Sequence, residues 1–194
     1  MSLIKKIKAV ELLYNNLDKE ISRFKQNSSL KCFDNCYHCC LKKNIEVMPI
    51  EFLPFAYHLY RTNQAYSFIE KLEQNTNDQV CILFNPFNSA GACESYAYRG
   101  LICRLFGFSA MINQKNEKSL ITCKLIKTEK RTEYESIQLK INQGMSLPKS
   151  SDYYLKLNSI DLTLSHSYTN INEAIKLAIE TVLFYFSFRN KKIS

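Results

Sequence analysis

Four cysteines fall close together in this sequence, at Cys32, Cys36, Cys39 and Cys40, and His38 lies among them. Side chains that are this close along the chain must also lie close in space. In a reducing compartment, thiols held together typically bind a soft metal ion or an iron–sulfur cluster. The stretch therefore predicts a metal centre.

The spacing limits how these thiols can share metal. Cys36 and Cys39 form a C-x-x-C pair, a spacing that lets two thiolates bind one ion. Cys39 and Cys40 are adjacent, and neighbouring side chains diverge in a helix or a strand, so the two suit different metals or different irons of one cluster. Four more cysteines follow, and we expect the fold to bring them to the first group: Cys81, Cys93, Cys103 and Cys123.

Eight thiols could bind either zinc or an iron–sulfur cluster, so their number does not decide the cofactor. They would complete two four-coordinate zinc sites, or hold one four-iron cluster with further cysteines beside it, whereas a single structural zinc would leave half of them unused. The adjacent pair and the total count favour iron–sulfur slightly over zinc.

Three other residues are candidates for roles beside the thiolates. Arg99 and Arg104 flank Cys103, and guanidinium groups donate hydrogen bonds to sulfur and offset thiolate charge. His38 is a possible nitrogen ligand, although alternation along the chain would point it away from the metal.

Composition bounds the class of protein. The chain has 194 residues, of which 46% are apolar, and a formal charge of +8, so one ordinary domain with a real core is expected. Eight thiolates binding two divalent ions would reduce that charge to about +4. The excess of basic residues is therefore only a weak indication of a nucleic-acid partner. The sequence shows no secretory signal and no apolar run of the ~18 residues that span a membrane. We therefore expect a cytoplasmic protein with reduced cysteines rather than disulfides.

Low glycine and proline content, four of each, favours helices over a barrel or sandwich. We expect a mainly α fold with a small β element (α+β), in one compact domain organised around the cysteine-rich metal site. Its parts would be an N-terminal helix over 1–27, a metal-binding core over 28–126, and a C-terminal helical extension over 127–194 that packs on the core.

Apolar residues that recur at spacings of three and four mark the helices. They are expected over residues 3–25, 49–61, 65–73 and 132–150, and from Asn170 onward. Pro54 would kink the second helix, and the last is apolar nearly all round, which predicts burial. Two strands, FSAMI and SLITCKLI, are expected around a turn at 113–118, and the basic run 124–131 is interpreted as a solvated strand end or linker.

The order of the cysteines resembles that of a known family. The close-set group ending in a Cys-Cys pair, then VCILF, ACESYAYRGLICRLFGFS and Cys123, looks like the YkgJ-like cysteine-cluster family of CxxCxxCC type, over about residues 30–125. That family is described as a zinc- or iron-chelating domain. Its members show a cysteine before a Tyr, then Arg-Pro, then Cys-Arg, and the residues that match here are Cys93, Tyr98, Arg99, Cys103 and Arg104.

This resemblance adds two expectations. Tyr98 would join Arg99, Arg104 and His38 as a residue that supports the ligands. Gly100 stands where the family usually has proline, which would loosen the local turn.

Other functions were weighed against metal binding. The flagellin lysine N-methylases resemble the same family through their cysteine cluster, which implies a methyltransferase acting on another protein, but no Gly-rich cofactor loop is present. A zinc-organised nucleic-acid module would use the basic run 124–131, yet the residues between the cysteines are mostly apolar or acidic, so nucleic acid is not expected as a partner. A cysteine-nucleophile hydrolase fits poorly, because crowded thiols would bind metal.

Overall fold

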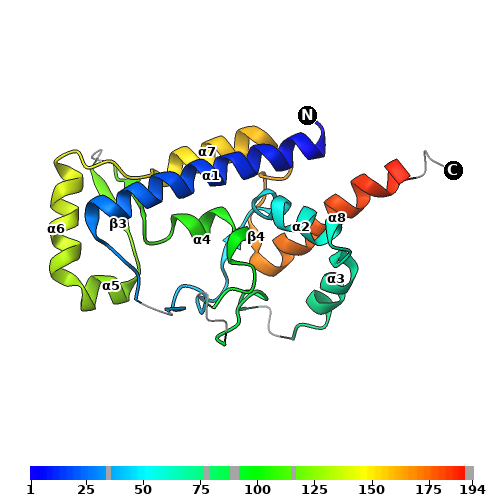
Figure 1. Ribbon diagram of the computed structural model, residues 1–194, viewed down its shortest axis with the longest axis horizontal. Coiled ribbons are helices and arrows are strands. Elements are labelled where there is room, and N and C mark those ends of the chain that lie inside the picture. Colours follow the sequence, from blue (N-terminus) through cyan, green and yellow to red (C-terminus); the bar gives the residue numbers. More distant parts are fainter. Residues whose placement is uncertain (34–35, 77–78, 88–91, 115–116, 191–194) are drawn as a thin grey trace.

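The computed structural model describes residues 1–33, 36–76, 79–87, 92–114 and 117–190. Helices dominate the fold, and two small antiparallel sheets complete it, so the predicted mainly α class with a small β element is confirmed. Figure 1 shows the long N-terminal helix and a shorter helix lying side by side along one edge, with further helices grouped at either end of the molecule.

The helical segments include two short 3-10 helices, labelled η. They are α1 (Leu3–Ser28), η1 (Pro49–Phe52), α2 (Leu53–Arg61), α3 (Ala65–Glu73), η2 (Tyr96–Tyr98), α4 (Leu101–Leu105), α5 (Lys124–Glu129), α6 (Arg131–Asn142), α7 (Ser150–Ile160) and α8 (Ile171–Asn190). The strands are β1 (Glu46–Val47), β2 (Ser109–Ile112), β3 (Lys118–Ile121) and β4 (Thr169–Asn170). Strand β1 pairs with β4, placing Val47 opposite Thr169, and β2 pairs with β3, placing Ala110 opposite Leu120.

Helix α1 confirms the helix predicted over 3–25. Its buried stripe follows the helical spacing and packs against α7 and α2 (Figure 1). The apolar residues of this stripe are Leu3, Ile7, Val10, Leu13, Tyr14, Leu17, Ile21 and Phe24. The helix ends at Ser28 because Ser29 adopts a left-handed conformation (φ 57°). The Ser29 N–H still donates to the Lys25 carbonyl at 3.0 Å, which closes the last turn.

The segment predicted as one helix over 49–61 divides at Pro54 into η1 and α2. Pro54 occupies one of the first positions of α2, where a missing N–H leaves no helical hydrogen bond unmade. It therefore begins a helix rather than kinking one. Both pieces are buried, and Phe52 and Phe55 are each 1% exposed.

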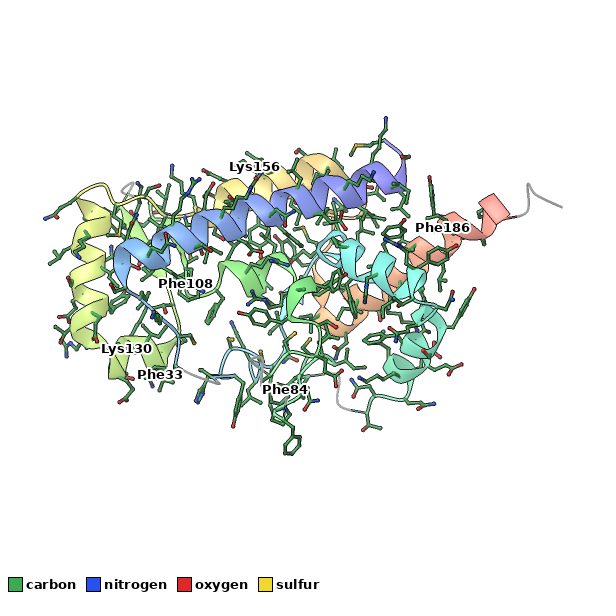
Figure 2. The ribbon with its side chains drawn as sticks, viewed as in Figure 1. Phe33, Phe84, Phe108, Lys130, Lys156 and Phe186 are labelled. Atoms are coloured by element: carbon green, nitrogen blue, oxygen red, sulfur yellow. The ribbon has the colours of Figure 1, made fainter. Side chains whose placement is uncertain are left out.

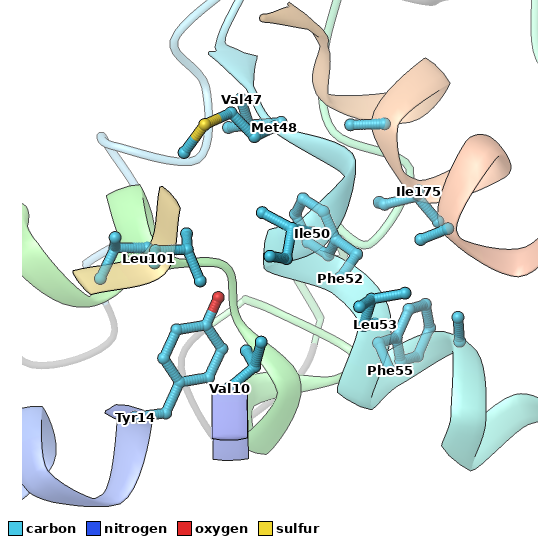
Figure 3. Close-up of a cluster of buried hydrophobic side chains, with 14 of the residues drawn as sticks. Val10, Tyr14, Val47, Met48, Ile50, Phe52, Leu53, Phe55, Leu101 and Ile175 are labelled. Carbon is cyan, nitrogen blue, oxygen red and sulfur yellow. The ribbon is translucent and has the colours of Figure 1, made fainter. Parts of the chain in front are cut away.

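The main core lies where α1, η1, α2, α7 and α8 meet. Figure 3 shows its centre, where Tyr14 and Val10 of α1 face Ile50 and Phe52, with Ile175 of α8 nearby. Segments from both ends of the sequence thus share one core. Cys93 is one of the buried members of this core and Cys81 packs against it, while the expected organisation of the domain around a metal site stays a prediction.

A second, smaller core lies between the end of α1, the β2–β3 hairpin and α6. Its buried members are Phe24, Leu30, Ala110, Leu120, Ile126, Ile137, Ile141 and Leu147. The predicted hairpin is confirmed, but its second strand ends at Ile121 and does not continue through the rest of SLITCKLI. The interpretation of 124–131 as a strand end or linker is wrong, because α5 occupies most of it. Burial of Ile126, which is 2% exposed, stabilises this short helix, and the charged composition gives no sign of that contact.

Helix α8 begins as predicted, and the Asn170 Oδ1 accepts the backbone N–H of Asn172 at 2.9 Å. Its first turns are buried in the main core, whereas Phe184 and Phe188 are 67% and 58% exposed near its far end. The expectation of burial all round is therefore wrong for the last turns, which project from the molecule (Figure 1). Within the described chain, no helix combines the length and apolar character that crossing a membrane requires.

Candidate metal centre

Seven cysteines lie on segments that come together beneath α4, away from the α1–α7 pair. Sulfur atoms gather in this region near Phe84 (Figure 2). Four of the cysteines follow α1, two lie in irregular chain joined by the antiparallel bridge between Phe84 and Cys93, and one lies in α4. They are Cys32, Cys36, Cys39, Cys40, Cys81, Cys93 and Cys103. All eight cysteines of the chain are free thiols.

The adjacent cysteines interact with each other and with more distant thiols. The hydrogen bond between Cys39 and Cys40 lowers the pKa of Cys39 to about 6, against the effect of burial. The same hydrogen bond raises the pKa of Cys40, and burial and the neighbouring charges of Cys39, Cys103 and Cys93 raise it further. The Cys39–Cys40 pair is thus electrostatically linked to α4 and to the segment that carries Cys93.

The later cysteines complete this group. Burial raises the pKa of Cys81 to about 12, and the charge of Cys93 adds to the effect. Burial also raises the pKa of Cys103, with further contributions from Cys81, Glu51 and Cys93. At the other end, Cys32 is an exposed residue, but partial desolvation of its thiol, together with the charge and hydrogen bond of Cys36, raises its pKa to about 11. One electrostatic neighbourhood therefore contains all seven thiols.

These thiols do not yet form a coordination geometry. In the part of the chain that the structure describes, no three His, Cys, Asp or Glu side chains converge closely enough to hold an ion. Metal binding would require the thiols to lose their protons. They would also have to turn toward the ion and give up present interactions such as the hydrogen bond between Cys39 and Cys40. The donor set itself fits zinc or iron, since it offers several soft sulfur donors in one place with no disulfide among them.

Cys123, the eighth predicted ligand, lies at the N-terminus of α5. Its Sγ accepts the backbone N–H of Ile126 at 3.4 Å, and its side chain packs against the second core. Lys130, just past α5, donates to the Lys31 carbonyl at 3.1 Å and lies 4.7 Å from the centre of the Phe33 ring. Cys123 therefore caps a helix in a part of the fold that contacts the start of the cysteine-rich loop.

Two of the predicted supporting residues make aromatic contacts. His38 is exposed, and its ring stacks on Tyr37 at 6.2 Å between centroids. The Tyr98 hydroxyl is hydrogen-bonded to Nδ1 of His58 at 3.0 Å, and the two rings stack at 4.5 Å. Tyr98 thereby fixes the end of η2 against α2.

Arg99 is a cation that acts on several of these thiols. Its guanidinium lies 3.5 Å from the centre of the Tyr96 ring, and its Nε donates to the Tyr96 carbonyl at 3.0 Å. From there its charge acts to lower the pKa of Cys39, Cys93 and Cys103, although burial dominates at the last two. A fixed positive charge of this kind favours thiolates, as a metal ligand set requires.

Arg104 holds the loop that carries Arg99. Its side chain is 5% exposed and forms an ion pair with Asp18 of α1. The same guanidinium donates to the carbonyls of Ala97 and Arg99 and lies 4.6 Å from the centre of the Tyr14 ring. These contacts fix the turn between Cys93 and Cys103 to the long helix.

A family model described as "CxxCxxCC: putative zinc- or iron-chelating domain" matches residues 31–137. That range is more than half of the chain and includes all eight cysteines. The chain belongs to the CxxCxxCC family. The resemblance drawn from the cysteine spacing is thereby confirmed, while no curated protein and no solved structure matches the chain.

Glu51 is a buried acidic side chain, hydrogen-bonded next to Cys103 of this CxxCxxCC chain, that sequence reasoning did not select. It is 0% exposed. Its Oε1 accepts the N–H of Met48 at 3.1 Å, and its Oε2 accepts the N–H of Ile102, the residue before Cys103, at 3.2 Å. Its own carbonyl accepts the Tyr14 hydroxyl at 2.8 Å. Glu51 thus joins the core to the helix that carries Cys103.

Gly100, where the resemblance leads to the expectation of proline, lies against this carboxyl group. The residue is buried with φ −62°, a value that proline also adopts. A Cβ at this position would lie 3.0 Å from both the Glu51 Oε2 and the Phe52 ring, so a larger residue would require one of these side chains to shift. The close approach of Glu51 and Phe52 therefore favours glycine here.

The buried carboxyl predicts a pH-dependent stability. Burial raises the pKa of Glu51 from 4.5 to about 7, against the hydrogen bonds it accepts. The folded state then holds a proton that the unfolded state releases, so this contribution to stability is complete below pH 4.5 and is lost as pH rises through 7. We expect metal-free wild type to lose about 2–3 kcal/mol relative to Glu51→Gln between pH 5 and pH 8. Chemical denaturation of both proteins across this range measures the difference.

A matched control is Glu46→Gln, because Glu46 is exposed on β1. Its stability curve should run parallel to that of wild type. A parallel curve for Glu51→Gln would contradict the assignment of the pH dependence to Glu51.

Proposed function

We propose that this chain binds zinc or iron through seven thiols, those of Cys32, Cys36, Cys39, Cys40, Cys81, Cys93 and Cys103. The observation that carries the proposal is that the fold brings segments far apart in the sequence together near Phe84, where sulfur atoms gather (Figure 2) and Phe84 forms an antiparallel bridge with Cys93. The charges of Cys93 and Cys103 acting on Cys40 agree with this arrangement. Membership of a family described by zinc or iron chelation supports it.

The chemistry of the neighbourhood supports the same proposal. Thiolates are the ligands that zinc and iron–sulfur clusters prefer. The charge of Arg99 offsets part of the negative charge that seven sulfurs would carry. Because Cys39 and Cys40 are adjacent, a centre with more than one metal ion, an iron–sulfur cluster or a zinc pair, suits the site better than a single zinc. Bound metal would cross-link loops that have little regular structure of their own.

Metal analysis of protein isolated without oxygen tests the proposal. We expect zinc or iron at one or more ions per chain, with brown colour if the centre is iron–sulfur. Removal of the metal by a chelator should lower the Tm, because metal bound only to the folded state stabilises it. A protein that retains neither metal, including after reconstitution under reducing conditions, would contradict the proposal.

A further inference from the structure

The side chain of Asn172, in the first turn of α8, lies against the chain on both sides of Cys81. Its Oδ1 accepts the backbone N–H of Ile82 at 2.8 Å, and its Nδ2 donates to the carbonyl of Val80 at 2.9 Å. Asn172 is 6% exposed. A single buried amide thus satisfies one donor and one acceptor of the irregular segment that carries Cys81, much as a neighbouring strand would.

The position of Asn172 is itself fixed. The helix begins immediately after β4, which pairs with β1, and the N–H of Ile171 donates to the Ile45 carbonyl at 2.9 Å. Ile171, Ala174 and Ile175 anchor the same turn, each 1% exposed or less. The amide therefore projects from one of the most firmly packed parts of the fold.

The segment that Asn172 holds has little regular structure. Cys81 lies outside the helices and strands, and its carbonyl accepts the N–H of Phe84 in a turn at 2.9 Å. On its outer side, Val80, Cys81 and Ile82 border a pocket of about 640 Å³ that opens beside α3. Without its inner hydrogen bonds, this segment would be free to move toward that space.

We propose that Asn172 is a positioning residue for Cys81, which makes α8 part of the metal centre although it lies outside the family match at 31–137. The inference rests on the proposed metal binding. Asn172 acts through the backbone: it fixes the Cα of Cys81 so that its thiol stays near those of Cys93 and Cys103. A ligand set that is already positioned binds metal more tightly than one that must be ordered first.

Alkylation footprinting in the presence of Zn²⁺ tests this residue by residue. Reduced protein is loaded with Zn²⁺ and treated with iodoacetamide, and mass spectrometry follows each cysteine. In wild type, we expect Zn²⁺ to protect Cys81 together with Cys39 and Cys103. In Zn²⁺-loaded Asn172→Ala, Cys81 should react with iodoacetamide about tenfold faster than in Zn²⁺-loaded wild type, while Cys39 and Cys103 stay protected. Mutation of residues that support metal ligands typically lowers metal affinity by about 10–100-fold.

Two further variants separate positioning from loss of folding. Asn172→Asp keeps the acceptor for Ile82 and a negative group that favours the N-terminus of α8, but it places an oxygen against the Val80 carbonyl. It should expose Cys81 in a helix that remains folded by circular dichroism. Val182→Ala removes buried volume from the same helix, ten residues beyond Asn172, and Zn²⁺ should protect Cys81 in this variant as in wild type.

The outcomes distinguish this inference from the proposed function. If Zn²⁺ protects no cysteine of the wild type, the zinc form of the proposed function fails, and the role of Asn172 in holding a zinc ligand fails with it. If Cys39 and Cys103 are protected in wild type but Cys81 is not, or if Cys81 stays protected in Asn172→Ala, the role of Asn172 is contradicted while metal binding stands. Loss of protection at every cysteine in folded Asn172→Asp would also contradict a role specific to Cys81.

Discussion

Replacement of both Cys39 and Cys40 by serine is expected to remove nearly all metal from the protein. The charges of Cys93 and Cys103 contribute to the raised pKa of Cys40. The pair, which belongs to the loop after α1, therefore lies close to both of those thiols. Serine hydroxyls do not ionise to replace thiolates as ligands. Loss of a mere supporting partner already costs about 10–100-fold in metal affinity, so we expect a loss of more than about 100-fold. Competition with a chromogenic chelator measures this affinity.

Cys123→Ser is the matched control for that variant. Its Sγ accepts the N–H of Ile126 at the start of α5, and serine is one of the preferred residues at such a position. We therefore expect this variant to keep its fold and to bind metal within a few-fold of wild type. If Cys123→Ser loses metal as severely as the double variant, Cys123 is a ligand after all and the seven-thiol set is wrong.

Arg104→Ala is expected to lower both stability and metal affinity. The side chain is 5% exposed, forms an ion pair with Asp18 and donates hydrogen bonds to the carbonyls of Ala97 and Arg99. Its removal leaves those two carbonyls without their partner and frees the loop that places Arg99 beside the thiols. We expect a loss of about 2–4 kcal/mol in the free energy of unfolding of the metal-free protein. Denaturant titration measures the loss, and chelator competition measures the accompanying fall in affinity.

Two variants make this prediction specific. Arg131→Ala removes an arginine from an exposed pair with Glu135 and should change stability by about 0.5 kcal/mol or less. Arg104→Lys keeps the charge but loses the planar group that reaches three partners at once, so it should fall between wild type and Arg104→Ala. Equal stability of Arg104→Ala and Arg131→Ala would show that the buried contacts contribute little.

Several elements could be predicted because their cause is local. The stripe of apolar residues along α1 repeats over seven turns, and such periodicity requires no knowledge of its partner. The helix over residues 65–73 and the β2–β3 hairpin were likewise found from pattern and turn composition. Elements stabilised mainly by distant contacts were missed. Helix α5 depends on burial of Ile126, and α7 has a weaker pattern and packs on α1.

The candidate site divides in the same way. Cysteine is rare enough, and its spacing distinctive enough, that the thiols and the family could be recognised from the sequence. Glu51 and Asn172 could not, because neither residue lies near a cysteine in the sequence and each acts through hydrogen bonds to distant backbone. A glutamate two residues after a proline and an asparagine at the start of a helix look ordinary until the chain folds.

The sequence alone determined that this protein carries a set of thiols spaced like metal ligands and a long amphipathic helix, since both follow from residue type and short-range spacing. The tertiary structure decided which thiols share one electrostatic neighbourhood, that Cys123 caps a helix at the second core, and that Glu51, Arg104 and Asn172 hold the segments around them. The physical reason is that these relations join residues far apart in the chain. Their energy comes from burial and hydrogen bonds that exist only once the core has formed.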